Sequence, residues 1–147
     1  MIYDALGLFS NAQALTATAF CTDKIDLTAT TPQRDLGDGE PLAVAIGVDV
    51  AADFTTGNET YQFDFVQSAN ADLSSPTVLQ SRIIVATLLT LGSLHYLDVP
   101  AGSITARYIG VQYVLGGTTP SITVTAYLTL QNFIQRFRAY AKNFVVN

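Results

Sequence analysis

Hydrophobic and polar residues alternate with a period of two along most of this chain. The clearest case is residues 42–50, where Leu, Val and Ile at the even positions alternate with Ala, Gly and Asp at the odd positions. A period of two places successive side chains on opposite faces of a β-strand. The same kind of pattern predicts strands at residues 61–65, 78–89, 94–99, 107–115 and 121–130, and two shorter strands at residues 16–21 and 24–27.

Segments rich in Gly, Pro, Asn and Asp separate these strands and predict turns. They are residues 35–41, 55–59, 74–76, 100–102 and 116–120. Short strands separated by turns favour an antiparallel sandwich or barrel, and about eight strands suit a jelly roll. We therefore expect an all-β protein: one antiparallel, jelly-roll-like β-sandwich of about eight strands that occupies residues 1–147 as a single domain.

The segment GGTTPSITVTAYL, residues 116–128, shows the expected inward and outward faces. Its first five residues predict a hairpin loop that joins residues 107–115 to residues 121–130. On the strand, Ile122, Val124, Ala126, Leu128 and Leu130 are expected in the core, and Thr123, Thr125, Tyr127 and Thr129 on the outer face.

The two ends of the chain differ from the rest. Residues 1–15 are apolar without a clear alternation, and we expect an extended N-terminal arm there. Residues 131–147 form the expected C-terminal helix and tail, because Phe133, Phe137, Tyr140 and Phe144 recur at the spacing of one helical face. Arg136, Arg138 and Lys142 have two interpretations that the sequence leaves open, a solvated helix face or a contact with an acidic neighbour.

Composition adds an expectation about partners. The chain has 147 residues, of which 49% are hydrophobic and only 13% are charged, about half the usual charged fraction. A surface this poor in charge suggests that part of it lies against another chain. Residues 1–98 hold all 12 acidic residues, while residues 99–147 hold four of the seven basic residues. We expect no nucleic-acid binding, because phosphate binding depends on dense Lys and Arg.

Membrane insertion and secretion are also not expected. The most apolar stretch, residues 83–91, is too short to span a bilayer. Asp4 interrupts the first apolar run, and no basic segment precedes it, so no secretory signal is expected. Because no secretory signal is expected, we interpret the N-glycosylation sequon at Asn58 as a turn.

Few residues suggest catalysis or metal binding. His95 is the single histidine, with no GxSxG segment or second metal ligand near it in sequence, and Cys21 is the single cysteine and is read as a small buried residue. Asp35, Asp38 and Glu40 lie in one Gly-rich loop without the spacing of a calcium loop. Asp49, Asp53, Glu59 and Asp64 resemble no paired-carboxylate site in sequence. We expect no enzyme, no cofactor and no metal.

Three long stretches carry a resemblance to a known family. They are MIYDALGLFSNAQALTATAF, DLGDGEPLAVAIGVDVAADFTTGNETYQFDF and RYIGVQYVLGGTTPSITVTAYLT. They resemble the small capsid cement (decoration) proteins of tailed bacteriophages, of the jelly-roll type found on podophage-like heads. The resemblance covers about residues 1–130.

The resemblance implies a structural protein on the outer surface of a virion, made in the host cytoplasm. Such proteins bind the outside of an HK97-like shell of major capsid protein, bridge neighbouring subunits and strengthen the shell against packaged DNA. We expect a homo-oligomer, a dimer rather than a trimer, because two-fold assemblies are common. Candidate contact residues are the apolar and basic residues of both ends: Tyr3, Leu6, Leu8, Phe9, Phe133, Arg136, Phe137, Arg138 and Tyr140.

Two alternatives remain open at this point. One is a jelly-roll module on the virion surface that binds a receptor or a glycan, which the absence of Trp weakens. The other is a hydrolase that depends on His95 and scattered carboxylates.

Overall fold

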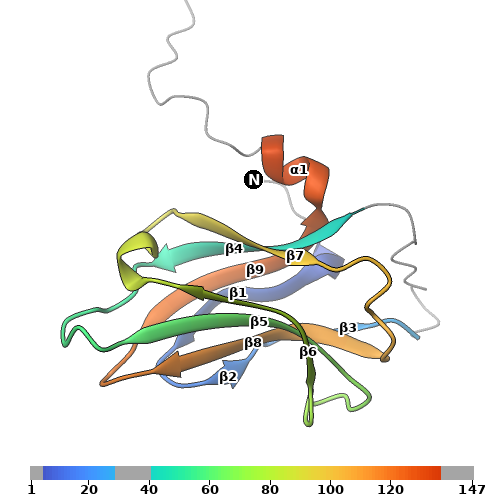
Figure 1. Ribbon diagram of the computed structural model, residues 1–147, viewed down its shortest axis with the longest axis horizontal. Coiled ribbons are helices and arrows are strands. Elements are labelled where there is room, and N and C mark those ends of the chain that lie inside the picture. The colour runs from blue at the N-terminus through green and yellow to red at the C-terminus, as the bar shows by residue number, and fades with distance from the viewer. Residues whose placement is uncertain (1–4, 29–40, 137–147) are drawn as a thin grey trace, which may run out of the picture.

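A computed structural model describes residues 5–28 and 41–136, which form two antiparallel β-sheets packed face to face (Figure 1). The first sheet, in the order β1-β9-β4-β7, contains β1 (Leu8–Leu15), β9 (Ile122–Leu130), β4 (Leu42–Val50) and β7 (Leu94–Val99). The second sheet, in the order β2-β8-β5-β6 with β3 also on β8, contains β2 (Ala19–Phe20), β3 (Ile25–Asp26), β8 (Tyr108–Gly116), β5 (Thr60–Ser68) and β6 (Thr77–Ile84). The short helical elements in this part of the chain are η1 (Ala5–Gly7), η2 (Ala86–Leu88) and α1 (Gln131–Arg136).

The connectivity is that of a jelly roll. β2 and β3 both pair with β8 and together fill one strand position, so the described chain has eight positions. With β2 and β3 counted as one position, the chain passes from one sheet to the other at each connection except the one between β5 and β6. Two antiparallel sheets joined in this way form the double Greek key of the jelly roll. The predicted all-β sandwich is confirmed.

The core lies between the sheets and follows from the alternation within each strand. In β4 the side chains of Val44, Ile46 and Val48 are at most 2% exposed and belong to the core. Phe9 of β1 meets Phe65 of β5 across the sandwich, with ring centroids 6.4 Å apart. These contacts join the two sheets through apolar side chains from both inner faces.

One buried polar contact also joins the sheets. Ser10 of β1 is fully buried, and its Oγ lies 2.7 Å from the hydroxyl of Tyr113 on β8. Ser10 Oγ in turn donates to Gln13 Oε1 at 2.7 Å, so Tyr113 donates to Ser10. Gln13 then reaches the next segment, because its Nε2 donates to the carbonyl of Phe20 at 2.9 Å. This chain of hydrogen bonds fixes β1 against the second sheet.

β1 replaces most of the expected N-terminal arm. Residues 8–15 pair with β9 and are part of the first sheet, so the prediction of an extended arm is wrong for them. The pairing shifts register between Leu8 and Ser10 and again before Gln13, and Ala12 has a φ of 47°. These bulges interrupt the alternation of side chains, which is why the sequence pattern did not predict a strand there.

One predicted strand ends earlier than expected, and one predicted helix is only partly described. The strand predicted at residues 78–89 ends at Ile84, and η2 follows it. The helix predicted at residues 131–147 is observed as Gln131–Arg136, and residues 137–147 lie outside the described part. Tyr127 lies on the outer face as predicted, but it is only 3% exposed. It pairs with Leu8 and Ala45 on the neighbouring strands, and η1 packs on β9.

The sandwich has two distinct ends. At one end, the amide of Ala52 donates to the carbonyl of Leu89 at 3.0 Å, and the amide of Asp53 donates to the carbonyl of Ser121 at 2.8 Å. The loops after β4, β6 and β8 are therefore held together there. At the other end, the Gln131 amide that begins α1 donates to the carbonyl of Pro41 just before β4. In Figure 1 the helix α1 rises from this second end on the outer side of the first sheet.

Candidate interaction surface

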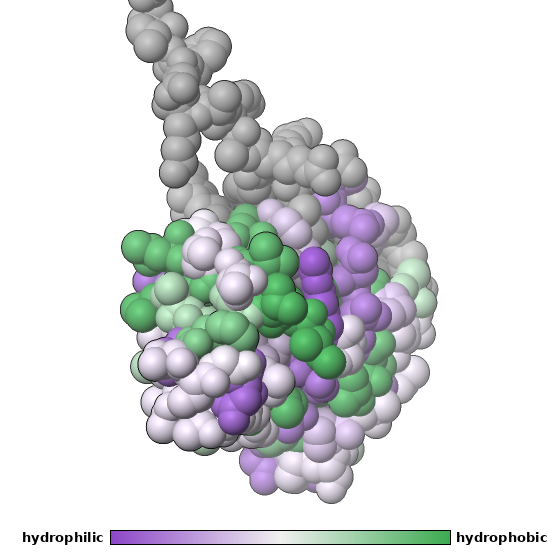
Figure 2. Space-filling model, turned by 60° about the vertical axis from the view of Figure 1, so that its left-hand side comes forward, coloured by the Kyte–Doolittle hydropathy of each residue, from purple (hydrophilic) through white to green (hydrophobic). Residues whose placement is uncertain are grey.

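Exposed apolar side chains gather at the end of the sandwich formed by the loops after β4 and β6. We call this set the apolar tip; its members are Val50 (57% exposed), Phe54 (46%), Ile83 (68%), Val85 (59%), Leu88 (59%) and Leu91 (72%). Figure 2 turns this end of the molecule forward and shows hydrophobic side chains grouped on its surface. Contiguous exposed apolar surface on a protein marks a contact with another molecule more often than scattered residues do.

The backbone beneath the apolar tip is held firmly. Val48 donates to the carbonyl of Ser93 at 3.0 Å and accepts from the amide of Gly92 at 2.8 Å. Leu89 is fully buried and Ala86 is 7% exposed, so the loop after β6 has its own anchors in the core. Its apolar exposed side chains are thus presented by an ordered backbone, which lowers the entropy cost of binding.

His95 supports the same loop from β7. Its Nε2 lies 3.1 Å from the carbonyl of Leu88 and 3.2 Å from Ser93 Oγ. Burial lowers the pKa of His95 below its ordinary value, and the bond to the Leu88 carbonyl opposes this only in part. The ring is therefore neutral near pH 7. Through these two contacts it supports the loop that carries part of the apolar tip.

A polar clamp joins the loops next to the apolar tip. The side chain of Asn58 makes two bonds to Thr118: Nδ2 donates to Thr118 Oγ1 at 3.1 Å, and Oδ1 accepts from the Thr118 amide at 3.0 Å. Tyr61 closes the clamp from below, since its hydroxyl donates to the carbonyl of Asp53 at 2.6 Å and accepts from the Ser121 amide at 3.2 Å. These bonds fix the loop after β4 against the loop after β8.

Glu59 is the buried acid of this clamp. Its residue is 4% exposed, and its Oε1 accepts from both the hydroxyl and the amide of Thr56. The Thr56 hydroxyl is the main reason that the pKa of Glu59 lies below its ordinary value. Among the side chains that the structure describes, the buried Oε2 has no hydrogen-bond partner.

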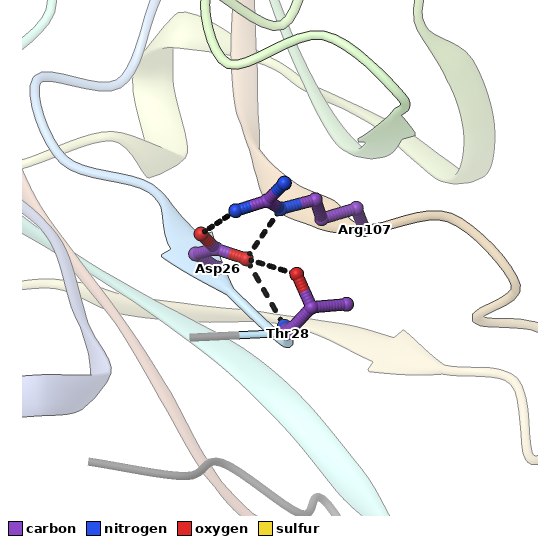
Figure 3. A network of polar contacts seen from close by, with 3 residues as sticks. All are labelled: Asp26, Thr28 and Arg107. Atoms are coloured by element: carbon purple, nitrogen blue, oxygen red, sulfur yellow. Dashed lines mark hydrogen bonds and ion pairs between the residues drawn. The ribbon is translucent and has the colours of Figure 1, made fainter. Parts of the chain in front are cut away.

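At the end of the sandwich away from the apolar tip, an ion pair between Asp26 and Arg107 joins β3 to the segment just before β8 (Figure 3). The guanidinium donates from Nε to Oδ1 at 2.9 Å and from Nη2 to Oδ2 at 2.8 Å. Thr28 adds two donors to Oδ1, from its amide and its hydroxyl. Arg107 also lies over the ring of Tyr108, 4.9 Å from the centroid.

A comparison of the chain with models of protein families finds a match that covers the sandwich described above. A model of the Bbp16 family matches residues 9–128, from the second residue of β1 to the seventh residue of β9. The chain belongs to the Bbp16 family. The matched region contains the whole core and the apolar tip, whereas α1 lies beyond it. A comparison with curated proteins finds no match.

The contact residues predicted for this Bbp16-family chain are only partly described. Leu6 in η1 is 50% exposed, Phe133 in α1 is 41% exposed, and Leu8 is half-buried in β1. The prediction is wrong for Phe9, whose side chain is fully buried between the sheets and offers no surface to a partner. Arg136 ends α1 but its side chain is not described, and Tyr3, Phe137, Arg138 and Tyr140 lie outside the described part.

The apolar tip was missed by the sequence analysis. Residues 83–89 of the apolar run 83–91 were assigned to a strand, because an apolar run that continues a strand pattern favours burial. A signal was present nonetheless: the run holds more large apolar residues than one face of a strand can place in the core. The end of such a run can be exposed instead of buried. Here it lies near the exposed Val50 and Phe54 and forms an apolar surface with them.

The remaining candidates of the sequence analysis have local contacts. Asp49 accepts from Thr125 Oγ1 at 2.6 Å, and Asp53 Oδ1 accepts from the amide and hydroxyl of Thr55. Asp64 accepts from Gln62 and from Ser81. Within the described residues, no three His, Cys, Asp or Glu side chains are grouped to hold a metal ion. Asp35, Asp38 and Glu40 lie outside these residues.

Cys21 lies in the core beside β8. Its Sγ accepts from the Val111 amide at 3.1 Å, and burial raises the pKa of the thiol to about 11. A buried thiol of this kind is a poor nucleophile at neutral pH. As for membranes, the helices in the described segments are all too short or too polar to cross a bilayer.

Proposed function

We propose that this chain is a non-enzymatic structural protein of a phage head that binds the outside of the assembled shell of major capsid protein. The observation that carries the proposal is the Bbp16 family match over residues 9–128, which covers the sandwich. The three stretches that resemble jelly-roll cement proteins lie largely in the same region. On this proposal the protein is made in the host cytoplasm and ends on the outer surface of the virion.

The surface of the sandwich suits a protein partner. The apolar tip, the half-exposed Leu6 of η1 and the exposed Phe133 of α1 offer apolar contact area at both ends of the molecule. The net charge of −5 suits an outer surface better than a surface that faces packaged DNA. A compact body with contact area at both ends is suited to bridging neighbouring subunits.

Bridging explains how modest contacts stabilise a shell. When one molecule contacts two subunits, the second contact forms at high effective concentration, and avidity exceeds either single affinity by about 10²–10⁴-fold. A ligand that binds only the assembled shell stabilises that shell by mass action. We propose that the protein acts as a homo-oligomer, a dimer rather than a trimer, which multiplies the number of contacts.

Reconstitution on shells tests the proposal. Heads of the parent phage assembled without this protein are mixed with the purified chain and pelleted, and the bound copies are counted. Saturation at a fixed number of copies per capsid subunit, together with survival of the heads at a higher temperature, is the expected result. Unassembled capsid subunits serve as the control and should bind little.

Two results would contradict the proposal. Equal binding to unassembled subunits would mean that the assembled lattice is not recognised. No binding to shells at all would remove the cement function, and a glycan array with the same purified chain would then test a virion-surface receptor-binding module.

A further inference from the structure

The clamp between the loops after β4 and β8 gathers oxygen atoms around the hydroxyl of Thr56. Three acceptors lie within hydrogen-bonding distance of this hydroxyl: Glu59 Oε1, Asn58 Oδ1 at 3.0 Å and the carbonyl oxygen of Thr118 at 3.3 Å. A hydroxyl carries one hydrogen, so Thr56 donates to only one of the three at a time. A positive ion, in contrast, contacts several oxygens at once. We call these four residues the oxygen cluster.

Glu59 brings a negative charge into the oxygen cluster. The residue is 4% exposed, and among the described residues its buried Oε2 has no hydrogen-bond partner. The Thr56 hydroxyl is the main reason that the pKa of Glu59 lies below its ordinary value, so the carboxyl is ionised at neutral pH. In the described part of the chain no basic side chain forms an ion pair with Glu59. A buried carboxylate oxygen without a donor or a counterion is costly, and a cation would remove that cost.

We propose that the oxygen cluster binds a calcium ion. Calcium takes six to eight oxygen ligands in a flexible arrangement, from carboxylates, amide and backbone carbonyls, and water. The cluster offers the Glu59 carboxylate, the Asn58 side-chain amide oxygen, the Thr118 carbonyl and the Thr56 hydroxyl, and water would complete the shell. Zinc prefers nitrogen and sulfur ligands, and magnesium demands a near-ideal octahedron, so both fit this irregular set of oxygens less well.

The loops bring these oxygens together before any ion binds. Asn58 and Thr118 already share two hydrogen bonds, at 3.1 Å and 3.0 Å. Gly117 lets the second loop come this close, because a Cβ there would lie 2.4 Å from the carbonyl oxygen of Asn58. Such a site exists only in the folded chain, so calcium should stabilise the fold by mass action. The ion would add a link between the loop after β4 and the loop after β8.

The affinity should be modest. With a single carboxylate in the cluster, we expect a dissociation constant of about 10⁻⁴–10⁻³ M, the range of weak extracellular calcium modules. The sequence analysis expected no metal because it searched for histidine, cysteine and paired acids. A site with one acid and three neutral oxygen donors lacks those signals, and Asn58 and Thr118 are 60 residues apart.

The test is thermal unfolding of the purified chain in calcium chloride, after treatment with a chelator, against sodium chloride at equal ionic strength. It compares the wild type with Glu59→Gln and with the matched control Asp53→Asn. Asp53 is an acid of the same loop, and its Oδ1 accepts from Thr55 outside the oxygen cluster. At a calcium concentration about ten times the dissociation constant, the melting temperature of the wild type and of D53N should rise by about 3–5 °C. E59Q should show no such rise.

A second variant keeps the test decisive if E59Q does not fold. Asn58→Asp places a second carboxylate in the oxygen cluster, so without calcium it should melt below the wild type. Calcium should bind N58D at least roughly 10-fold more tightly than the wild type, because affinity follows the number of charged ligands. An NMR titration with calcium chloride measures both constants and should shift the amide signals of Gly57 and Thr118.

Four results would each overturn the inference: no calcium-dependent rise in the wild type, an equal rise in folded E59Q, an equal effect of sodium, or calcium binding to N58D no tighter than to the wild type. The proposed function does not depend on this site. Shell binding measured with the chelator present tests that function separately, so the failure of either proposal leaves the other standing.

Discussion

Asp26 and Arg107 form a bidentate ion pair that ties the two-residue strand β3 to the segment leading into β8. The same segments share a backbone bond, because the amide of Leu27 donates to the carbonyl of Arg107 at 2.9 Å. β3 is too short to hold its place by strand pairing alone. The ion pair therefore fixes the chain locally, just before residue 29.

The first prediction follows from this pair. Asp26→Asn removes the charge and one acceptor, so the Leu27 amide should exchange its hydrogen faster, while the melting temperature at pH 7 should fall by a small but measurable amount because the pair is solvated. Arg107→Lys should act in the same direction, since a lysine has no two-pronged donor geometry. Hydrogen exchange measured by NMR checks both variants. Unchanged protection of Leu27 would mean that β3 is held by its neighbours and not by the ion pair.

The contribution of the pair also has a defined dependence on pH. The Arg107 guanidinium is the main reason that the pKa of Asp26 lies far below its ordinary value of 3.8. Because the folded pKa is lower than the unfolded one, the stabilisation is present above about pH 4 and is lost as the pH falls below it. The melting temperatures of the wild type and D26N should therefore converge as the pH is lowered from 7 toward 2. A constant difference across this range would contradict the assignment.

The second prediction concerns Cys21. Burial raises the pKa of its thiol from 9.0 to about 11, so at pH 8 the folded protein holds roughly 100-fold less thiolate than the unfolded chain. Alkylation by iodoacetamide should be at least that much slower in buffer than in denaturant, because steric burial adds to the effect. Mass spectrometry of the labelled fraction over time measures both rates. Rapid labelling of the folded protein would mean that β2 and β8 separate readily around Val111.

Some parts of the fold were predictable from the sequence. β4 has the bounds that the pattern predicts, because bulky and small residues alternate strictly along it, and β7 has the predicted bounds because Pro100 ends its apolar run. β1 was not predicted, because its bulges at Ser10 and Gln13 shift side chains between the two faces. Phe9 was consequently assigned to a contact surface although it fills the core.

The apolar tip could not be located from the sequence for a different reason. A hydrophobic run looks the same whether it is buried or exposed, and only the sheet order shows that the chain turns away from the core after Ile84. The hydrogen bonds of the clamp are likewise invisible in sequence, because Asn58 and Thr118 are 60 residues apart.

The third prediction compares two glycines with similar backbones. Gly57 has a φ of 77° and open space around it, while Gly117 has a φ of 92° and approaches the loop of Asn58. A Cβ at position 117 would lie 2.4 Å from the Asn58 carbonyl oxygen and 2.7 Å from Glu59 Cα. Gly57→Ala should cost about 1–2 kcal/mol from the left-handed backbone alone, and Gly117→Ala about 1–3 kcal/mol more.

Chemical denaturation of G57A and G117A measures this difference. G57A is the matched control, because it carries the backbone strain without the steric clash. Equal losses for the two variants would show that the loop after β4 moves away from Gly117 at little cost, and that the clamp beside the apolar tip is looser than its hydrogen bonds indicate.

The last prediction uses the buried pair Ser10 and Tyr113. Tyr113→Phe leaves Ser10 Oγ bonded to Gln13, so it should cost about 0.5–1.5 kcal/mol, the value of one hydrogen bond. Ser10→Ala instead buries the Tyr113 hydroxyl without its Ser10 partner and should cost about 1–3 kcal/mol. The double variant should then be no less stable than S10A, because it removes the stranded hydroxyl as well. Urea unfolding of the three variants forms a double-mutant cycle, and additive losses would mean that the two groups do not interact.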